Sequence, residues 1–338
     1  MGCQFPASKI DLDLITSSGG ISDLKISKIP PLEIENEGCQ YLPSELKYAL
    51  KSKLRKKCGI NSQIIEISIE EFNTALNRNY FANDILTMYE PKMNLIPYEE
   101  DVFYKDLNPI KVNDNEGSIQ YYKGGFNKKG QCHGKGIWIK DFNIYYGNFK
   151  NDEFDGTGLF ITEQGDYYFG QWKNSQYNGY GSIIASKKLV YRGFFKNGKK
   201  EGFGEEAYPD GDYYDGAFCN GEKNGRGTYT FSDGTNYKGY FKNSKYNGYG
   251  NLKWGAGDKI KGDFKDGKLD GQGNFNWVDG SKFDGNFIDD KKAGKGTYFW
   301  GDGKSYTGYW KNDSACGTGI YNDPNTPNTG GNEKIIID

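Results

Sequence analysis

Aromatic, glycine and polar positions recur every 23 residues between Tyr122 and Tyr321. Each period opens with Tyr-x-Gly-x-Phe or Tyr-x-Gly-x-Trp, in which alternate residues share one face, as Tyr214, Gly216 and Phe218 do. A polar loop and an alternating Gly-x-Gly segment follow. Turns rich in Asp-Gly then separate the periods and supply the positive φ that tight hairpin turns require. Each period therefore predicts a β-hairpin.

The pattern runs through nine consecutive rows. The rows start at Tyr122, Tyr145, Tyr168, Tyr191, Tyr214, Tyr237, Ile260, Phe283 and Tyr306. Such a short period is typical of arrays whose units bury their apolar faces by stacking on neighbours. We expect a mainly β protein, a single elongated, twisted, open antiparallel meander of about nine hairpins, preceded by a small α-helical N-terminal region.

The strand glycines require a reason of their own, because glycine in a strand contributes no side chain to packing. We expect each glycine to leave a slot that an aromatic ring of the next strand fills. Rings that follow Gly-x-Gly, such as Tyr229, Phe275 and Trp277, are placed to do so. This ring-on-glycine packing would form the core.

The pattern resembles the MORN repeat (membrane occupation and recognition nexus), whose consensus is Tyr-x-Gly-x-Phe/Trp, a polar loop, Gly-x-Gly and a glycine turn. The resemblance covers residues 122–321. Three rows depart from it: the first has a late Gly-x-Gly, the third has Ser186-Lys-Lys188 for its turn, and the seventh begins with Ile260. The resemblance implies a stand-alone repeat array without a catalytic domain, similar to protist MORN scaffolds or to radial spoke head proteins.

The flanking regions predict four further segments. They are an extended, poorly ordered stretch at 1–43, a small helical region at 44–95, a linker at 96–121 and a C-terminal tail at 322–338. We expect the helical region to pack on another part of the chain, with the open edge near Tyr122 as one place. Two prolines after Asn322 would blunt the last edge, and the final isoleucines either dock or remain free.

Two features near the start indicate membrane contact. Gly2 becomes available for myristoylation once Met1 is removed, and Cys3 suits palmitoylation, although Pro6 stands where Ser or Thr is usual. A predicted helix after Ser44 carries basic residues around a leucine stripe. They are Lys47, Lys51, Lys53, Arg55, Lys56 and Lys57. Such a helix can lie on anionic lipid, or it can dock through its leucines with the charges in solvent.

Charge and cysteine usage narrow the class of protein. The repeats carry 29 Lys and Arg against 24 Asp and Glu, which leaves 14 against 21 for the rest of the chain. This small excess of positive charge does not argue for nucleic-acid binding.

No run reaches the roughly 18 apolar residues of a membrane-spanning helix. The six cysteines show no paired spacing and no secretory signal precedes them, which predicts a cytoplasmic protein with reduced thiols.

The sequence offers no catalytic motif. There is no phosphate-binding Gly-x-x-x-x-Gly-Lys-Ser/Thr, and the Gly-x-Gly pairs lie within strands rather than before helices. The single histidine, His133, excludes a metal site built on a histidine pair. We therefore predict no enzyme, cofactor, metal site or small-molecule substrate.

The function predicted is a scaffold that holds protein partners along its sheet at a membrane or cytoskeletal site. About 17–18 strands spaced at about 4.8 Å give a ribbon of roughly 80–90 Å, which suits an extended helix or coiled coil. The expected contacts are rings that exceed the repeat pattern: Tyr146, Phe169, Tyr177, Phe194, Tyr240, Tyr246 and Tyr309. A structural subunit of the ciliary axoneme is the alternative. Mass spectrometry of the native N-terminus separates the two, because only the membrane scaffold needs acylation.

Overall fold

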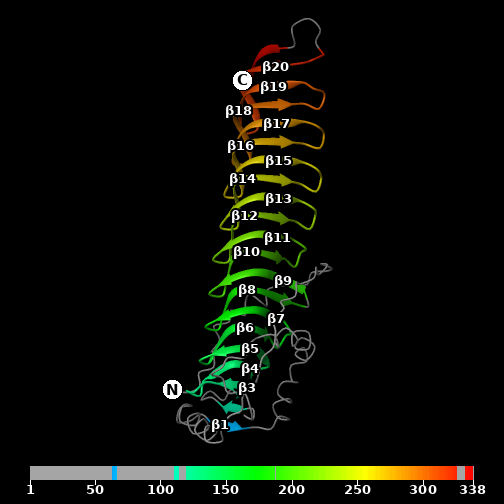
Figure 1. The fold of residues 1–338 in the computed structure, drawn as a ribbon. Coiled ribbons are helices and arrows are strands. Elements are labelled where there is room, and N and C mark those ends of the chain that lie inside the picture. Colours follow the sequence, from blue (N-terminus) through cyan, green and yellow to red (C-terminus); the bar gives the residue numbers. More distant parts are fainter. Residues whose placement is uncertain (1–62, 67–109, 114–118, 187, 326–331, 338) are drawn as a thin grey trace, which may run out of the picture. The chain divides into compact units, whose positions relative to one another are not determined.

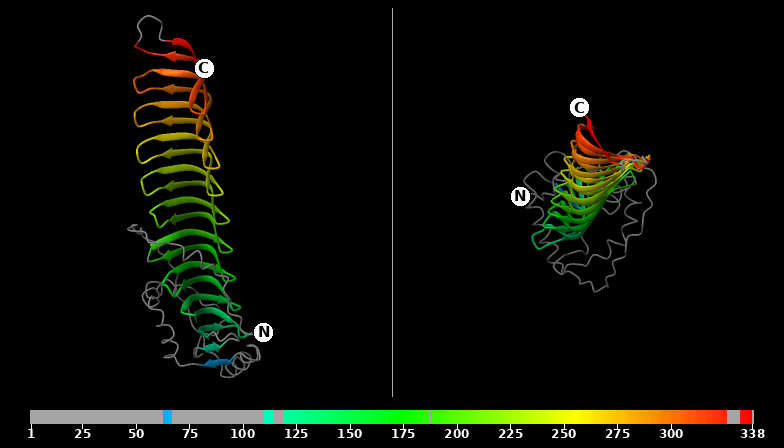
Figure 2. Two further views of the ribbon diagram at one scale, coloured as in Figure 1. Left: turned by 180° about the vertical axis from the view of Figure 1, so that it is seen from behind. Right: turned by 90° about the horizontal axis from the view of Figure 1, so that it is seen from above.

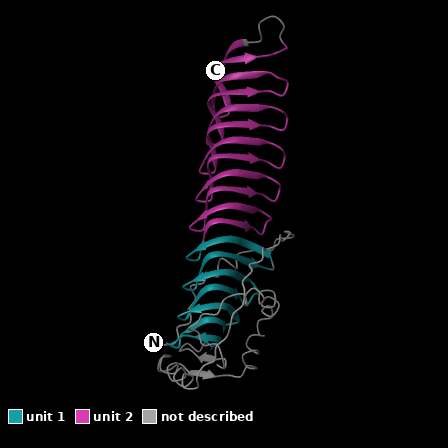
Figure 3. Ribbon diagram, viewed as in Figure 1, with its two compact units in different colours: residues 1–199 teal, residues 200–338 magenta. Residues whose placement is uncertain are grey.

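The computed structural model describes residues 63–66, 110–113, 119–186, 188–325 and 332–337 (Figure 1). The chain divides into two compact units, residues 1–199 and residues 200–338 (Figure 3). Every strand pairing within each unit is antiparallel and joins strands that follow one another along the chain. Within each unit, successive strands turn relative to one another (Figure 2), as expected of a twisted sheet. The mainly β fold and the hairpin repeats are thus confirmed.

The strands of unit 1 are β1 (Gln63–Glu66), β2 (Ile110–Asn113), β3 (Ile119–Phe126), β4 (Cys132–Lys140), β5 (Asn143–Lys150), β6 (Glu153–Ile161), β7 (Tyr167–Lys173), β8 (Gln176–Ala185) and β9 (Lys188–Lys196). Those of unit 2 are β10 (Lys199–Ala207), β11 (Tyr213–Cys219), β12 (Glu222–Thr230), β13 (Asn236–Lys242), β14 (Lys245–Lys253), β15 (Lys259–Lys265), β16 (Lys268–Asn276), β17 (Lys282–Ile288), β18 (Lys291–Phe299), β19 (Ser305–Lys311), β20 (Ser314–Asn322) and β21 (Asn332–Ile337).

The row tyrosines form the centre of the core. Tyr237 is fully buried, its ring lies over Gly239 of its own strand and Gly250 of the next, and its hydroxyl donates to the carbonyl of Tyr240 at 3.0 Å. The same hydrogen bond, from the hydroxyl to the carbonyl three residues later, is made by Tyr122, Tyr145, Tyr168, Tyr191 and Tyr214. We call the face that carries these rings the front face, and the opposite side the back face.

This arrangement corrects the expected source of the ring. In the rows that begin with an aromatic residue, the ring over the glycine pair comes from that residue, two positions before the first glycine, and not from the residues after Gly-x-Gly. Paired glycines therefore form a line across each sheet, with Gly227 facing Gly216 on one side and Gly239 on the other. The first glycine of Gly-x-Gly has another role. Gly225 lies beside a register shift with φ of 104°, which a side chain would strain.

We expect Gly250→Ala to destabilise the protein by about 1–3 kcal/mol, because the new methyl group would lie 2.6 Å from two carbons of the Tyr237 ring. Gly273→Ala is the matched control. It belongs to the row that begins with Ile260, and its methyl group would approach no atom closer than 3.0 Å. Urea unfolding followed by tryptophan fluorescence measures both variants. Equal losses would contradict the assignment of the glycine slot to tyrosine.

The hairpin loops differ from the expectation. The tight two-residue turns lie within rows, where Asn220 and Gly221 both have positive φ. The Asp-Gly segments between rows belong to wider turns, in which the N–H of Phe231 donates to the carbonyl of Thr235 and only Gly234 has positive φ. Since a two-residue hairpin turn of this type needs positive φ at both positions, asparagine and glycine suit the inner loop best.

In several rows the residue nine places after the row start packs on the ring of the first residue. Phe154 stacks on Tyr145 with ring centroids 3.7 Å apart, and Tyr246 stacks on Tyr237 at the same distance. Where this position is lysine, a cation replaces the second ring: Lys292 Nζ lies 5.5 Å from the centre of the Phe283 ring. One structural position is thus filled by several kinds of side chain.

Side chains in the loops also connect neighbouring rows. The carboxylate of Asp290 accepts the N–H of Leu269, and that of Asp313 accepts the N–H of Lys292. At the other end of the strands, the carboxylate of Asp258 accepts the N–H of Val278. Each such bond spans 20 or 21 residues, so it ties one row to the next.

The first and last strands of the repeats are each paired with a strand from a flanking region. β2 lies in the segment interpreted as a linker, and it pairs with β3, while β1 pairs with β2. At the other end β21 pairs with β20, with Gly317 opposite Ile337. The C-terminal isoleucines therefore dock, and strand pairing rather than proline covers the edge of β20. The helices expected in 44–95 lie outside the described residues.

Unit 1 has a second apolar cluster on its back face. Ile139, Ile144, Leu159 and Ile161 are buried there, and Phe169 packs against them. The corresponding back-face pair on β12 and β13 of unit 2 is Thr228 and Lys238, as judged from their place beside the glycine line. Apolar character on both faces was not anticipated for the first rows.

Candidate partner-binding surfaces

Three of the seven predicted contact residues are exposed on the back face. Phe194, Tyr240 and Tyr309 expose 49%, 45% and 50% of their surface. Each is the residue after the first glycine of its row, so it points away from the row tyrosine. Tyr146 and Phe169 also lie on the back face but are half-buried.

Two of the predicted contact residues belong to the core face. Tyr177 is buried, and its ring stacks on Tyr168 with centroids 3.8 Å apart. Tyr246 occupies the equivalent position over Tyr237. Both fill the position nine residues after the row start and pack on the row tyrosine, so Tyr177 is closed to a partner, while Tyr246 is half-buried.

The prediction missed three exposed rings on the back face. Tyr180, Phe203 and Tyr249 expose 48%, 67% and 60% of their surface. Each is the middle residue of a Gly-x-Gly segment. The signal was present in the sequence, because the residue between two core-facing glycines must point to the other side of the strand.

We call these exposed rings the back-face row: Tyr180 and Phe194 in unit 1, and Phe203, Tyr240, Tyr249 and Tyr309 in unit 2. In unit 1 the first two lie edge to face with centroids 5.4 Å apart. In unit 2 Arg226 lies opposite Tyr240, with its guanidinium carbon 5.6 Å from the ring centre.

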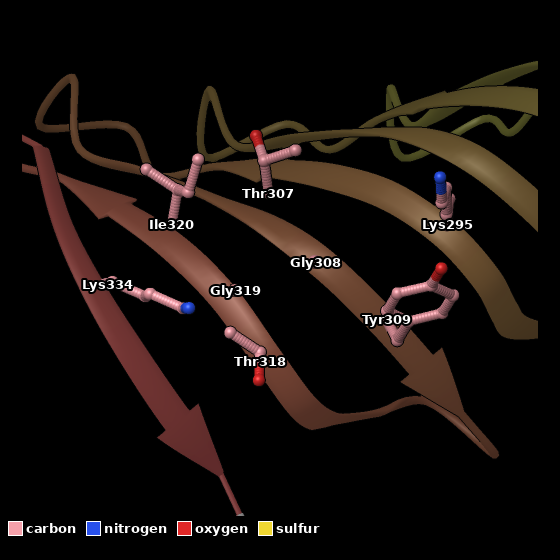
Figure 4. A pocket seen from close by; sticks show the side chains of 8 residues that line it. All are labelled: Lys295, Thr307, Gly308, Tyr309, Thr318, Gly319, Ile320 and Lys334. Carbon is pink, nitrogen blue, oxygen red and sulfur yellow. The ribbon is translucent and has the colours of Figure 1, made fainter.

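A hollow of about 520 Å³ lies at the end of the back-face row in unit 2 (Figure 4). Its lining consists of Lys295, Thr307, Gly308, Tyr309, Thr318, Gly319, Ile320 and Lys334. Gly308 and Gly319 contribute only backbone to it, because a side chain on either would point to Tyr306 on the front face. Lys295 Nζ lies 5.7 Å from the centre of the Tyr309 ring. The hollow thus combines apolar surface with two cations.

The front face of unit 2 carries a second set of rings, which we call the front ladder. Its members are Tyr208, Tyr229, Phe231, Trp254, Phe275, Trp277, Tyr298, Trp300 and Tyr321. They were expected to form the core, but all are half-buried or exposed, with 39% of Trp300 accessible. In unit 1 the corresponding Phe160 and Ile183 are buried, so the expectation holds there.

Two titratable groups of the front face lie in surroundings that shift their pKa. Burial lowers the pKa of Lys292, whose Nζ lies 4.8 Å from the Tyr298 ring centre and 5.0 Å from that of Trp310. Burial is the main cause that raises the pKa of the Cys132 thiol, and the charge of Asp152 raises it further. The thiol therefore stays protonated. Neither group is activated as a nucleophile.

Other chemistry is limited within the described ranges. No group of three or more histidine, cysteine, aspartate or glutamate side chains is placed there to hold a metal ion. None of these residues belongs to a helix long and apolar enough to cross a membrane. Gly2, Cys3 and the basic residues from Lys47 to Lys57 lie outside them.

The fold and surfaces define a repeat protein built from stacked β-hairpins with ring-bearing faces. The chain belongs to the MORN repeat family. The family model matches residues 122–140, 145–167, 168–186, 191–213, 214–236, 237–259, 261–282, 283–305 and 306–325. The MORN repeat is a non-catalytic repeat, and it suggests a scaffold that binds protein or associates with membrane.

No curated protein matches the chain in sequence. Among solved structures, the SAS-4 (dCPAP) TCP domain of Drosophila melanogaster, in complex with a proline-rich motif of Ana2 (dSTIL), is 15% identical, with a TM-score of 0.27. The match covers 54% of this chain and 84% of that one. The TCP10 domain of Danio rerio CPAP is 10% identical over 63% of this chain and 89% of that one, with a TM-score of 0.22. Such scores do not establish a shared fold.

Proposed function

We propose that the protein is a non-enzymatic scaffold that holds an extended helix or coiled coil along the back face of its sheet. The observation that supports this is the back-face row. Its rings repeat beside the glycine line, and exposed aromatic side chains with neighbouring cations make good interface anchors. The presence of Arg226, Lys295 and Lys334 beside the rings of unit 2 favours a partner helix with an acidic stripe.

The same proposal includes a site of action at the inner face of a membrane. Acylation of Gly2 and Cys3 would supply two lipid chains, which suffice for stable anchoring, whereas one does not. The basic helix from Lys47 to Lys57 would add attraction to anionic lipid.

Affinity capture from the source cell with a Tyr240→Ala, Tyr249→Ala, Tyr309→Ala triple variant tests the proposal. We expect the captured helical partner to fall at least tenfold in quantitative mass spectrometry, because truncation of interface aromatics often costs over 1 kcal/mol each. A Val278→Ala variant is the control, since Val278 is an exposed apolar residue in the turn after β16. Equal capture by the triple variant and the unaltered protein would refute the back face as the binding surface.

A further inference from the structure

The front ladder of unit 2 presents one turn-opening ring in each of five successive rows. Tyr208, Phe231, Trp254, Trp277 and Trp300 each begin the turn that joins one row to the next. Their backbone N–H closes that turn: that of Trp277, for example, donates to the carbonyl of Ser281 at 3.0 Å. The backbone that carries each ring is therefore fixed by its turn.

The rings form a nearly continuous aromatic track across the strands. Centroid steps are 5.4 Å from Trp254 to Phe275, 4.3 Å on to Trp277, 5.5 Å to Tyr298 and 5.0 Å to Trp300. The first two steps are stacked, with ring planes 22° apart. This track remains partly open to solvent along its length in unit 2.

The tryptophans of the track differ from the other three in the use of their indole N–H. The indole nitrogens of Trp138, Trp172 and Trp310 donate to Gln120, Gly158 and Gly296 at 3.1 Å. Those of Trp254, Trp277 and Trp300 donate to no atom within the described ranges. A buried indole usually finds an acceptor, so these half-exposed donors are available to a ligand carbonyl.

The spacing of the track selects a ligand conformation. Two strands per row place successive turn-opening rings about 9.6 Å apart. A polyproline II helix advances about 9.3 Å per turn of three residues, so one turn fits one row. A heptad of α-helix rises about 10.5 Å, about 0.9 Å more than the row spacing, whereas a polyproline II turn is about 0.3 Å shorter than it. An α-helix therefore loses register with the rings about three times faster.

The turns beside the track are acidic. The five turns at 208–212, 231–235, 254–258, 277–281 and 300–304 contain six aspartates and one lysine. The carboxylates of Asp233 and Asp279 accept hydrogen bonds from groups of Thr235 and Ser281, which lowers their pKa and keeps them charged. The ladder also carries two cations, Lys223 beside Tyr208 and Lys292 beside Trp277. A ligand with positive charge is therefore favoured at the turns, where the aspartates lie, and not over the rings.

We propose that the front ladder binds a proline-rich segment of a partner protein that carries basic residues, as a polyproline II helix laid across the strands. Prolines would pack between successive rings, the free indole N–H groups would donate to the ligand backbone, and lysine or arginine would face the turn aspartates. Aromatic-lined grooves recognise proline-rich segments in this manner because the ligand helix is formed in advance. This surface is on the opposite face from the back-face row, so it does not depend on the function proposed above.

A synthetic (Pro-Pro-Lys)₅ peptide, titrated against the full-length protein, tests the proposal by tryptophan fluorescence. We expect saturable binding, with affinity about tenfold lower for Trp277→Leu, which keeps an apolar side chain but removes the ring and its donor. Ile288→Ala, which removes an exposed apolar side chain at the far end of β17 from these turns, should leave the affinity unchanged. A (Gly-Gly-Lys)₅ peptide of equal length and charge should bind at least tenfold more weakly.

A second measurement uses the unaltered protein, so it does not depend on how the variant folds. In nitrogen-15 NMR spectra the indole signals of Trp254, Trp277 and Trp300 should shift with peptide, while those of Trp138, Trp172 and Trp310 remain in place. Equal binding of the glycine peptide would show that charge alone attracts the ligand, and would overturn the proposal. Unshifted indole signals, or full affinity in Trp277→Leu, would do the same.

Discussion

Replacing Tyr237 with alanine is expected to lower the free energy of unfolding by about 3–5 kcal/mol. The ring is fully buried, stacks on Tyr246 at 3.7 Å and meets Phe241 and Phe264 edge-on at 5.2 and 5.3 Å. Its loss would leave a cavity above Gly239 and Gly250, because these glycines have no side chains that could fill it. Urea unfolding at neutral pH measures the change.

Two further variants isolate the cause of this loss. Tyr240→Ala removes a ring of the same type three residues away, but that ring is exposed, so we expect a change within about 0.5 kcal/mol. Tyr237→Phe removes only the hydrogen bond to the Tyr240 carbonyl and should cost about 1 kcal/mol. The eighth row already uses Phe283 in this position. A Tyr237→Ala variant as stable as Tyr240→Ala would exclude the tyrosine as the centre of the hairpin.

Alkaline pH is expected to unfold the protein. Burial raises the pKa of Tyr145, Tyr168, Tyr214 and Tyr237 above the ordinary value, and it raises the pKa of Tyr246 to about 12. Raised values mean that the folded state keeps protons that the unfolded chain releases near pH 10. The contribution to stability is therefore complete below about pH 10 and is lost as pH rises through 12 and above.

Tyrosinate absorbance and circular dichroism, recorded together from pH 8 to 13, measure this transition. We expect the two signals to change together, because the buried rings ionise when the sheet opens. Tyr246→Phe is the matched variant: it keeps a ring stacked on Tyr237, as Phe154 does on Tyr145, and removes one titrating group. Its unfolding midpoint should lie at higher pH. Equal unfolding midpoints for this variant and the unaltered protein would rule out Tyr246 as a contributor to the alkaline transition.

The hairpin fold was predictable because one period of glycine and aromatic residues specifies two strands and a turn. The source of the buried ring was not. Periodicity shows that Tyr214 and Gly227 share a face, but only the direction of the side chain along its own strand decides which ring lies over the glycine. The strands β2 and β21 were also missed, because short segments at 110–113 and 332–337 carry no repeat signal.

The partner surface was predicted in part for a related reason. Exposed Phe194, Tyr240 and Tyr309 follow from strict alternation beside a glycine. The packing of Tyr177 and Tyr246 on the row tyrosines was not anticipated, because the position they occupy holds Phe154 in one row and Lys223 in another. Because the residue type at this position varies, the sequence does not indicate its shared role of packing on the row tyrosine, which the structure shows.

The bonds that tie each loop to the next row have a consequence for how the length of this protein can change. A carboxylate such as Asp290 reaches a backbone N–H 21 residues away, and side chains alternate between faces along every strand. Removing or adding a few residues would break both relations, whereas a whole period would preserve them. The sheet can therefore grow or shrink only in steps of one complete hairpin, about 9.6 Å each, and the number of rows sets the length of any ligand laid across it.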